Sequence, residues 1–204
     1  MIKNIIFDLG NVTFHFNCFD MIREMTNSDE EYEELKNITF SSETWKKYDQ
    51  GLYTKEEVTD IFLSQVEEDY KKDKLRDIMN RWTDYIVNND RIINLIKTLR
   101  ENGYKTFILS NAPFEIPDLV NARGLNEIFD GSVFSCFEHI NKPDSRLYQI
   151  LLEKYDLEAE ECAFLDDRHD NCDTANSLGI FGICYRDYAY EEAFENLRKL
   201  GVKF

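Results

Sequence analysis

Short apolar runs alternate with amphipathic helical patterns along most of this 204-residue chain, and this alternation limits the possible folds most strongly. Runs of strand length occupy residues 5–7, 106–109, 133–137, 163–165 and 180–185. Helical patterns with one apolar face separate several of these runs. Strands joined by helices pair in parallel and are covered by helices on both faces. The sequence therefore predicts an α/β fold with a three-layer parallel sheet.

One long stretch, residues 14–87, interrupts the alternation because only helical patterns are found in it. Thr54 stands at the expected N-cap of one of these helices, and Glu57 follows at the spacing of a capping box. We therefore expect an all-helical cap over residues 14–87. The Rossmann-like core would then consist of residues 1–13 and 88–204.

The charge balance excludes several classes of partner. There are 24 Lys and Arg residues against 40 Asp and Glu residues, so the formal net charge is -16. A chain of this charge repels the backbone of nucleic acids and anionic membrane surfaces. No apolar run approaches the ~20 residues of a membrane-spanning helix. We expect no nucleic-acid or membrane partner, and an anionic substrate would require a local positive centre.

The cysteines and the amino terminus bear on the compartment. The five cysteines form no C-x-x-C pair and are odd in number, which favours reduced thiols. The apolar stretch at the amino terminus is shorter than the hydrophobic region of a signal peptide. We expect a cytoplasmic protein and favour a monomer.

Polar side chains stand at or soon after the ends of four expected strands. In chain order they are Asp8, then Ser110 and Asn111, then Lys142, then Asp166 and Asp167. Each alone could be an ordinary helix cap. Ligands of open α/β sheets bind outside the carboxyl ends of the strands, so four such positions in order favour a shared site.

This set of side chains suits phosphoryl transfer. Asp8 can act as a carboxylate nucleophile. A Mg²⁺ ion held by Asp8 and Asp167 would offset the repulsion between carboxylate and phosphate, since Mg²⁺ binds carboxylates, phosphate oxygens and water. Lys142 would supply a second positive charge, and Ser110 and Asn111 can donate hydrogen bonds to phosphoryl oxygens. Catalysis would then consist mostly of positioning and charge stabilisation.

Four motifs resemble those of the haloacid dehalogenase (HAD) superfamily, in the order IIFDLGNV, FILSNA, NKPDSRLYQ and FLDDRHDN. The resemblance covers nearly the whole chain, and a helical cap between the first two motifs is typical of subfamily I. FDLGNV and YDQGLYTKEE are most similar to the α-D-glucose-1-phosphate phosphatase-like members. The resemblance implies a Mg²⁺-dependent phosphatase that acts on a small phosphorylated metabolite, such as a sugar phosphate, through an aspartyl phosphate.

The resemblance also implies roles for the residues on the metal side of the site. Asp8 would be both the nucleophile and a metal ligand, and Gly10 would offer its backbone carbonyl to the metal. Asp167 is favoured as the direct or water-mediated ligand, with Asp166 behind it. The motif alone leaves the order of these two carboxylates open.

On the phosphate side, the resemblance implies that Ser110 and Asn111 hold the phosphoryl group. Lys142 would orient Asp8 and neutralise both Asp8 and the phosphate. The implied catalytic set is therefore Asp8, Ser110 and Lys142.

One position departs from the family pattern. Many phosphatases of the family carry a second Asp two residues after the nucleophile as general acid and base, whereas Gly10 and Asn11 stand here. A missing general acid typically lowers the rate ~10²–10⁴-fold. The chain would then need good leaving groups, another proton donor, or low activity. His15 is a weak candidate donor, no role is assigned to His139, and His169 is expected in a loop.

The aromatic and basic residues of the cap have two interpretations. Trp45, Tyr48 and Tyr53 could face the active site, and Lys46 and Lys47 could attract an anionic substrate. The favoured alternative is that the aromatic rings form the core of the cap and that the lysines are solvated.

Three other functions stay open. A metal-independent haloacid dehalogenase would use the same nucleophile, but the neighbouring pair of carboxylates argues against it because unneutralised carboxylates repel each other. A phosphomutase or phosphotransferase would share the whole site. A catalytically weak phosphate-binding protein would explain Gly10.

Overall fold

The computed structural model describes residues 1–186 and 189–204. Its centre is a five-stranded parallel sheet in the spatial order β5-β4-β1-β6-β7. The strands are β1 (Asn4–Phe7), β4 (Lys105–Ser110), β5 (Gly131–Phe134), β6 (Cys162–Asp166) and β7 (Phe181–Cys184). The expected parallel α/β sheet is thereby confirmed, with the first strand of the chain in the middle.

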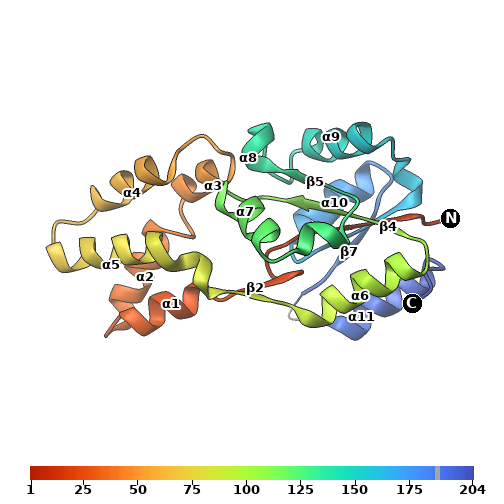
Figure 1. Ribbon diagram of the computed structural model, residues 1–204. Helices are drawn as coiled ribbons and strands as arrows, with labels where there is room; N and C mark the ends of the chain where they lie inside the picture. The colour runs from red at the N-terminus through yellow and green to blue at the C-terminus, as the bar shows by residue number, and fades with distance from the viewer. Residues whose placement is uncertain (187–188) are drawn as a thin grey trace.

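Helices cover both faces of this sheet (Figure 1). One face packs against α6 (Asp90–Glu101), α7 (Glu115–Ala122) and α11 (Tyr190–Lys199), and the other against α9 (Ser145–Tyr155) and α10 (His169–Ser177). Side chains of β1 alternate between the two cores, since Ile5 and Phe7 lie in one and Ile6 lies in the other. The predicted three-layer arrangement follows from this alternation.

Most of the remaining chain forms a helical lobe beside the sheet (Figure 1). It contains α1 (Cys18–Met25), α2 (Asp29–Ile38), α3 (Glu43–Asp49), α4 (Lys55–Leu63), α5 (Asp69–Arg81) and the 3₁₀ helix η1 (Trp82–Tyr85). Thr54 and Glu57 form the predicted capping box at the start of α4. Such a cap stabilises a helix by about 1 kcal/mol.

The expectation of helices only over residues 14–87 is wrong at both ends. The strands β2 (Phe14–Phe16) and β3 (Ile86–Asn88) form an antiparallel pair where the chain enters and leaves the lobe. A strand of three residues is too short to show a period of two, so the sequence pattern did not reveal this pair. The pairing holds the two connecting segments side by side, and the lobe is attached to the core through them.

The expected strand over residues 133–137 is half wrong. Strand β5 ends at Phe134, and the short helix α8 (Ser135–Glu138) follows at once. A continuous apolar run does not distinguish a buried strand from a buried helical turn. The helical turn brings Ser135 and Cys136 to the edge of the core that meets α3. Two further 3₁₀ helices, η2 (Leu125–Ile128) and η3 (Ala159–Glu161), complete the elements.

Two expectations about composition can be compared with the structure. All five cysteines are free thiols, as predicted. Within residues 1–186 and 189–204, no helix combines the length and the apolar character that crossing a bilayer requires.

Candidate active site

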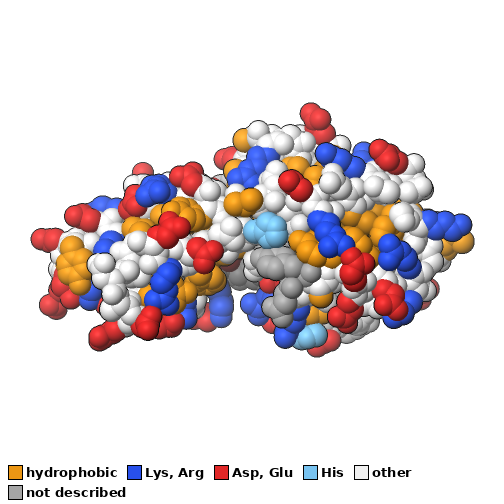
Figure 2. Space-filling model, turned by 90° about the horizontal axis from the view of Figure 1, so that it is seen from below, with side chains coloured by type: hydrophobic (Ala, Val, Ile, Leu, Met, Phe, Trp, Pro, Cys, Tyr) orange, Lys and Arg blue, Asp and Glu red, His pale blue; other side chains and the backbone are white. Residues whose placement is uncertain are grey.

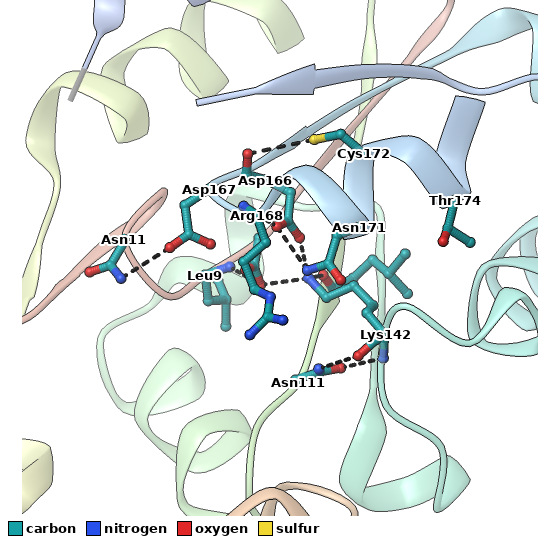
Figure 3. A network of polar contacts seen from close by, with 12 residues as sticks. Leu9, Asn11, Asn111, Lys142, Asp166, Asp167, Arg168, Asn171, Cys172 and Thr174 are labelled. Carbon is teal, nitrogen blue, oxygen red and sulfur yellow. Dashed lines mark hydrogen bonds and ion pairs between the residues drawn. The ribbon is translucent and has the colours of Figure 1, made fainter. Parts of the chain in front are cut away.

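The predicted polar residues meet at the carboxyl end of the sheet. Figure 3 shows Asn111, Lys142, Asp166 and Asp167 of this group. Asp8 directly follows β1, Ser110 ends β4, and Asp166 ends β6. Since β4 and β6 flank β1 on opposite sides, the chain connections diverge at this point. Such a divergence leaves a crevice outside the strand ends in which ligands bind.

Lys142 lies at the centre of the site. Its ammonium group donates to the Leu109 carbonyl at 2.8 Å and to Asp166 Oδ2 at 2.6 Å, and it lies 3.0 Å from Asp8 Oδ1. These three acceptors match the three hydrogens of an ammonium group. Burial alone would lower the pKa of Lys142, but the charges of Asp166 and Asp8 outweigh it and raise the pKa. Lys142 therefore stays charged.

The two oxygens of Asp8 are in different situations. Oδ1 accepts the Leu9 N–H at 2.7 Å and faces Lys142, whereas Oδ2 has no hydrogen bond within the described parts of the chain. Burial raises the pKa of Asp8 to about 7, against the lowering effect of Lys142 and with a further rise from Asp166 and Asp167. The bonds to Oδ1 fix the side chain, and Oδ2 stays available for chemistry.

Asp166 and Asp167 differ in how many of their oxygens are already bonded. Asp166 is fully buried; Oδ2 accepts from Lys142, and Oδ1 accepts from the Arg168 N–H and the Asn171 side chain. Asp167 accepts one bond, from Asn11 to Oδ2 at 3.1 Å. Burial raises the pKa of Asp167, and the charge of Asp166 adds to this rise. Asp166 is therefore a support for Lys142, whereas Asp167 keeps a free oxygen.

The carboxylates of Asp8, Asp166 and Asp167 present oxygens within 4.8 Å of one another. The donor set fits a hard cation such as Mg²⁺, since Asp8 Oδ2 and Asp167 Oδ1 are free and carboxylate oxygens are the ligands it prefers. The Gly10 carbonyl, in the loop that follows β1, accepts no hydrogen bond from residues 1–186 or 189–204. The geometry therefore favours Asp167 over Asp166 as the ligand beside Asp8.

Asn11 is a residue of the site that the sequence reasoning did not assign. Its backbone has a positive φ of 55°, a left-handed conformation that Asn tolerates better than most residues. Its amide donates to Asp167, and its carbonyl accepts the Phe16 N–H at 3.3 Å. Asn11 thus connects the loop after β1, the loop after β6 and strand β2.

Ser110 and Asn111 present different groups to the site. Within the described residues, the hydroxyl of the buried Ser110 forms no hydrogen bond, so it is free to contact a ligand. The side-chain amide of Asn111 forms two bonds with the backbone of Lys142, at 2.7 and 2.9 Å. Its side chain therefore positions Lys142, and the backbone N–H of Asn111 is a further donor for a phosphoryl group.

A cavity of about 580 Å³ opens above these residues, between the core and the helical lobe. Its core side contains Asp8, Ser110, Lys142, Asp167 and Arg168, and its lobe side contains Phe14, Phe16, Phe19, Phe40, Trp45, Asp49 and Trp82. The aromatic rings pack edge to face, with 4.6 Å between the ring centroids of Phe40 and Trp45. The buried indole Nε1 of Trp82 has no hydrogen-bond partner in the described chain. The cavity therefore joins a charged floor to an aromatic wall.

The two interpretations of the cap aromatics are both partly correct. Trp45 is buried in the core of the lobe and also forms part of the cavity wall. Tyr48 is buried as well, and its hydroxyl donates to Glu115 of α7. Lys46 contributes to the cavity wall, whereas Lys47 and Tyr53 do not.

The three histidines lie outside the cavity wall. His15 is in β2, between two phenylalanines that do line the cavity. His139 Nδ1 lies 2.9 Å from the Gln50 carbonyl, so this side chain joins the core to the end of α3. His169 is the first residue of α10 rather than a loop residue.

Comparisons with known proteins agree with this geometry. The haloacid dehalogenase-like hydrolase family model matches residues 2–179. A sesquiterpene phosphatase of Aspergillus oryzae is 26% identical over 188 residues, which are 91% of this chain and 90% of that protein. A flavin mononucleotide hydrolase of Arabidopsis thaliana is 23% identical over 158 residues, 78% of this chain and 62% of that protein.

The fold also matches solved structures. A HAD family enzyme of Bacteroides thetaiotaomicron, solved in complex with magnesium and inorganic phosphate, aligns with a TM-score of 0.71. It is 21% identical, and the alignment covers 94% of this chain and 99% of that chain. Agreement over almost the full length of both chains shows that the helical lobe belongs to the shared fold.

Proposed function

The chain belongs to the haloacid dehalogenase-like hydrolases, and from this premise we propose that it is a Mg²⁺-dependent phosphatase of small phosphomonoesters. One observation carries the proposal. Asp8 has one oxygen fixed by Lys142 and the Leu9 N–H, while its other oxygen is free, and the carboxylates of Asp8 and Asp167 present oxygens within 4.8 Å of each other. A fixed carboxylate with one free oxygen is what a covalent nucleophile requires.

The reaction would proceed through an aspartyl phosphate. Asp8 Oδ2 attacks phosphorus and the alcohol leaves, and a water molecule then attacks the same phosphorus and releases phosphate. Ser110 Oγ and the Asn111 backbone N–H donate to the phosphoryl oxygens. Lys142 holds Asp8 and offsets its charge. When bound by Asp8, Asp167 and the Gly10 carbonyl, Mg²⁺ would reduce the repulsion between the two anions.

The cavity wall bears on the substrate class. We propose a phosphomonoester whose organic part is apolar or flat, because the aromatic rings of the lobe offer few polar partners to a bare sugar. A terpenoid phosphatase and a flavin mononucleotide hydrolase among the relatives fit this class. The helical lobe, residues 14–87, would act as the cap that encloses the substrate.

The test is phosphate release from a panel of monophosphates with Mg²⁺ and with EDTA. The panel contains p-nitrophenyl phosphate, an isoprenoid monophosphate, FMN and glucose 1-phosphate. We expect turnover that requires Mg²⁺ and is abolished by Asp8→Asn, with the isoprenoid phosphate or FMN ahead of glucose 1-phosphate. Full turnover of the Asp8→Asn variant would refute the nucleophile.

Parallel assays separate the other functions. Chloride release from 2-chloropropionate without metal would indicate a dehalogenase instead. Interconversion of sugar phosphates without net phosphate release would indicate a mutase. Tight binding of a phosphomonoester without turnover would indicate a binding protein.

A further inference from the structure

The loop that carries the nucleophile contains no proton donor for the leaving group. Gly10 stands two residues after Asp8, and the next side chain, Asn11, is bonded to Asp167 and to the Phe16 N–H. Phosphoryl transfer to Asp8 leaves a negative charge on the oxygen of the departing alcohol. An alkyl alcohol leaves slowly unless that oxygen is protonated as the bond breaks. A donor must therefore come from elsewhere on the cavity wall.

Most ionisable side chains of the wall already have partners. The set consists of Asp8, Lys46, Asp49, Lys142, Asp167, Arg168 and Asp170. Arg168 and Asp170 form an ion pair at 2.7 Å, and Lys46 pairs with Glu43. Lys142 is surrounded by three acceptors.

Within residues 1–186 and 189–204, the carboxyl group of Asp49 forms neither a hydrogen bond nor an ion pair, and its contact with Ser135 is made by its backbone carbonyl. This carboxyl group is on the lobe side of the cavity, opposite the floor that holds Asp8. Asp8 and Asp167 have other roles in the proposed reaction. Among the ionisable groups of this wall, Asp49 is therefore the one without an assigned partner or role.

The position of Asp49 is fixed by contacts between the end of α3 and the core. Its backbone carbonyl accepts from the Ser135 hydroxyl. The carbonyl of the following Gln50 lies 2.9 Å from His139 Nδ1. The Asn141 amide donates to the Lys46 carbonyl at 2.8 Å. A backbone held from several directions in this way keeps the base of the Asp49 side chain in a constant position relative to the cavity.

The surroundings of Asp49 favour its protonated form. Burial raises its pKa well above the usual value of an Asp, and the negative charges of Asp8 and Glu115 raise it further. Cys136 on α8 also faces it, as a neutral thiol whose pKa burial raises to about 11. Lys46 and Lys47, on the same helix, are the cations nearest to it in sequence; Lys46 is paired with Glu43, and Lys47 does not line the cavity.

Building on the proposed function, we propose that Asp49 is the general acid and base of the reaction and replaces the donor that Gly10 cannot supply. As Asp8 Oδ2 bonds to phosphorus, the bond from phosphorus to the leaving oxygen breaks, and its electron pair stays on that oxygen. The Asp49 carboxyl group gives that oxygen its proton. In the second step the Asp49 carboxylate takes a proton from the attacking water, and phosphate leaves Asp8. The sum is one ester and one water converted to one alcohol and one phosphate.

The test compares two substrates that differ in leaving group. p-Nitrophenyl phosphate releases nitrophenolate, a good leaving group that needs no proton. Benzyl phosphate releases benzyl alkoxide, a poor leaving group unless it is protonated. We expect Asp49→Asn to lower kcat/KM for benzyl phosphate by ~10²–10⁴-fold, the usual effect of a general acid. For p-nitrophenyl phosphate kcat/KM should change less than about tenfold, since it reports only the first step. A burst of nitrophenol should appear because water attack has lost its base.

Two variants serve as controls. Glu115→Gln removes the neighbouring negative charge but keeps an acceptor for Tyr48, and it should not change the ratio between the two substrates. Asp49→Glu keeps the carboxyl group and should restore part of the benzyl phosphate activity. An equal loss on both substrates, or no loss on either, would overturn the assignment of Asp49.

The wild-type enzyme provides a second measurement that does not depend on the folding of a variant. The kcat/KM for benzyl phosphate should fall at high pH as Asp49 loses its proton, and kcat/KM for p-nitrophenyl phosphate should not. Identical profiles for both substrates would contradict the proposal. If wild-type protein with Mg²⁺ turned over neither substrate, the proposed phosphatase function itself would fail.

Discussion

Asp8, the proposed nucleophile, lowers the stability of the folded chain at neutral pH. It lies among two other carboxylates, and burial is the main reason that its pKa rises from 3.8 to about 7. A carboxyl group with a raised pKa binds its proton more tightly in the folded state than in the unfolded state. Stability is therefore lost as pH rises from about 4 through about 7.

We predict that Asp8→Asn stabilises the metal-free protein at pH 8. One pKa unit corresponds to about 1.4 kcal/mol, so the relief is on the order of a few kcal/mol. For a domain of this size that is a rise in Tm of roughly 3–10 °C. The gain should be smaller at pH 5, where wild-type Asp8 is already protonated. Differential scanning calorimetry at both pH values, with EDTA, measures it.

Saturating Mg²⁺ is the control for this prediction. The ion binds the ionised wild-type site and not the amide, so it should reduce or reverse the advantage of Asp8→Asn. A variant less stable than wild type at pH 8 in EDTA would show that Asp8 carries no net charge penalty.

Replacing Asp166 or Asp167 by Asn should have different effects on stability and on Mg²⁺ binding. Asp167→Asn removes a proposed ligand with one internal bond, so it should abolish the rise in Tm that Mg²⁺ causes and change metal-free stability little. Asp166→Asn removes the shortest partner of buried Lys142 and should destabilise the chain by up to about 3–5 kcal/mol. Thermal unfolding across a Mg²⁺ titration separates the two effects. If Mg²⁺ raised the Tm of Asp167→Asn as much as that of the wild type, a group other than Asp167 would be the metal ligand.

At the scale of elements, helix α3 connects the helical lobe to the candidate active site. Gly51 follows its end with a φ of +67°, and a Cβ there would lie 2.3 Å from the Cys136 carbonyl oxygen. Gly124 has the same φ of +67°, but its surroundings are open within 4 Å. The two glycines therefore separate the effect of backbone conformation from the effect of close packing.

We predict that Gly51→Ala and Gly124→Ala differ in activity. Both substitutions force a left-handed alanine and should destabilise the fold by about 1–2 kcal/mol. Only Gly51→Ala also moves the end of α3, and with it Asp49 and Lys46, away from the core. It should lower kcat/KM for p-nitrophenyl phosphate at least about tenfold, since small misplacements in an active site reduce rates strongly. Equal kcat/KM values in the two variants would show that docking of α3 is not needed.

The helices and strands also differ in how well the sequence predicts them. The strands of the parallel sheet are buried apolar runs, and four of them are followed by a chemically distinct side chain. The sheet and the position of the site were therefore predictable. Strands β2 and β3 were not, because three residues carry no period. Helix α8 was hidden in an apolar run that also suits a strand.

The site shows a similar division between local and distant information. Asp8, Ser110, Lys142 and Asp167 follow from strand ends, because parallel strands bring their carboxyl ends to one edge. Asp49 could not be predicted in the same way. Its position depends on contacts from Ser135, His139 and Asn141, which are far away in sequence and act on backbone atoms.

At the scale of the whole molecule, the net charge of -16 opposes the approach of a phosphate ester. On the face in Figure 2, acidic side chains are spread over both the helical lobe and the core rather than gathered in one patch. A substrate dianion therefore meets a negative field at distance, whichever part of this face it approaches. The positive charges proposed to receive it, Lys142 and a Mg²⁺ ion held by Asp8 and Asp167, would lie inside the cavity and act at short range.

We therefore predict that kcat/KM for p-nitrophenyl phosphate rises with ionic strength. The screening length falls from about 30 Å at 0.01 M salt to about 8 Å at 0.15 M, so distant repulsion is screened before the contacts in the cavity weaken. An increase of severalfold is expected at fixed, saturating free Mg²⁺, with kcat nearly constant because the bound state already includes the short-range contacts. Steady-state assays in sodium chloride and in choline chloride should agree if screening is the cause. A steady fall of kcat/KM with salt would mean that attraction from Lys46, Arg168 and the bound cation reaches into the solvent and exceeds the repulsion of the acidic surface.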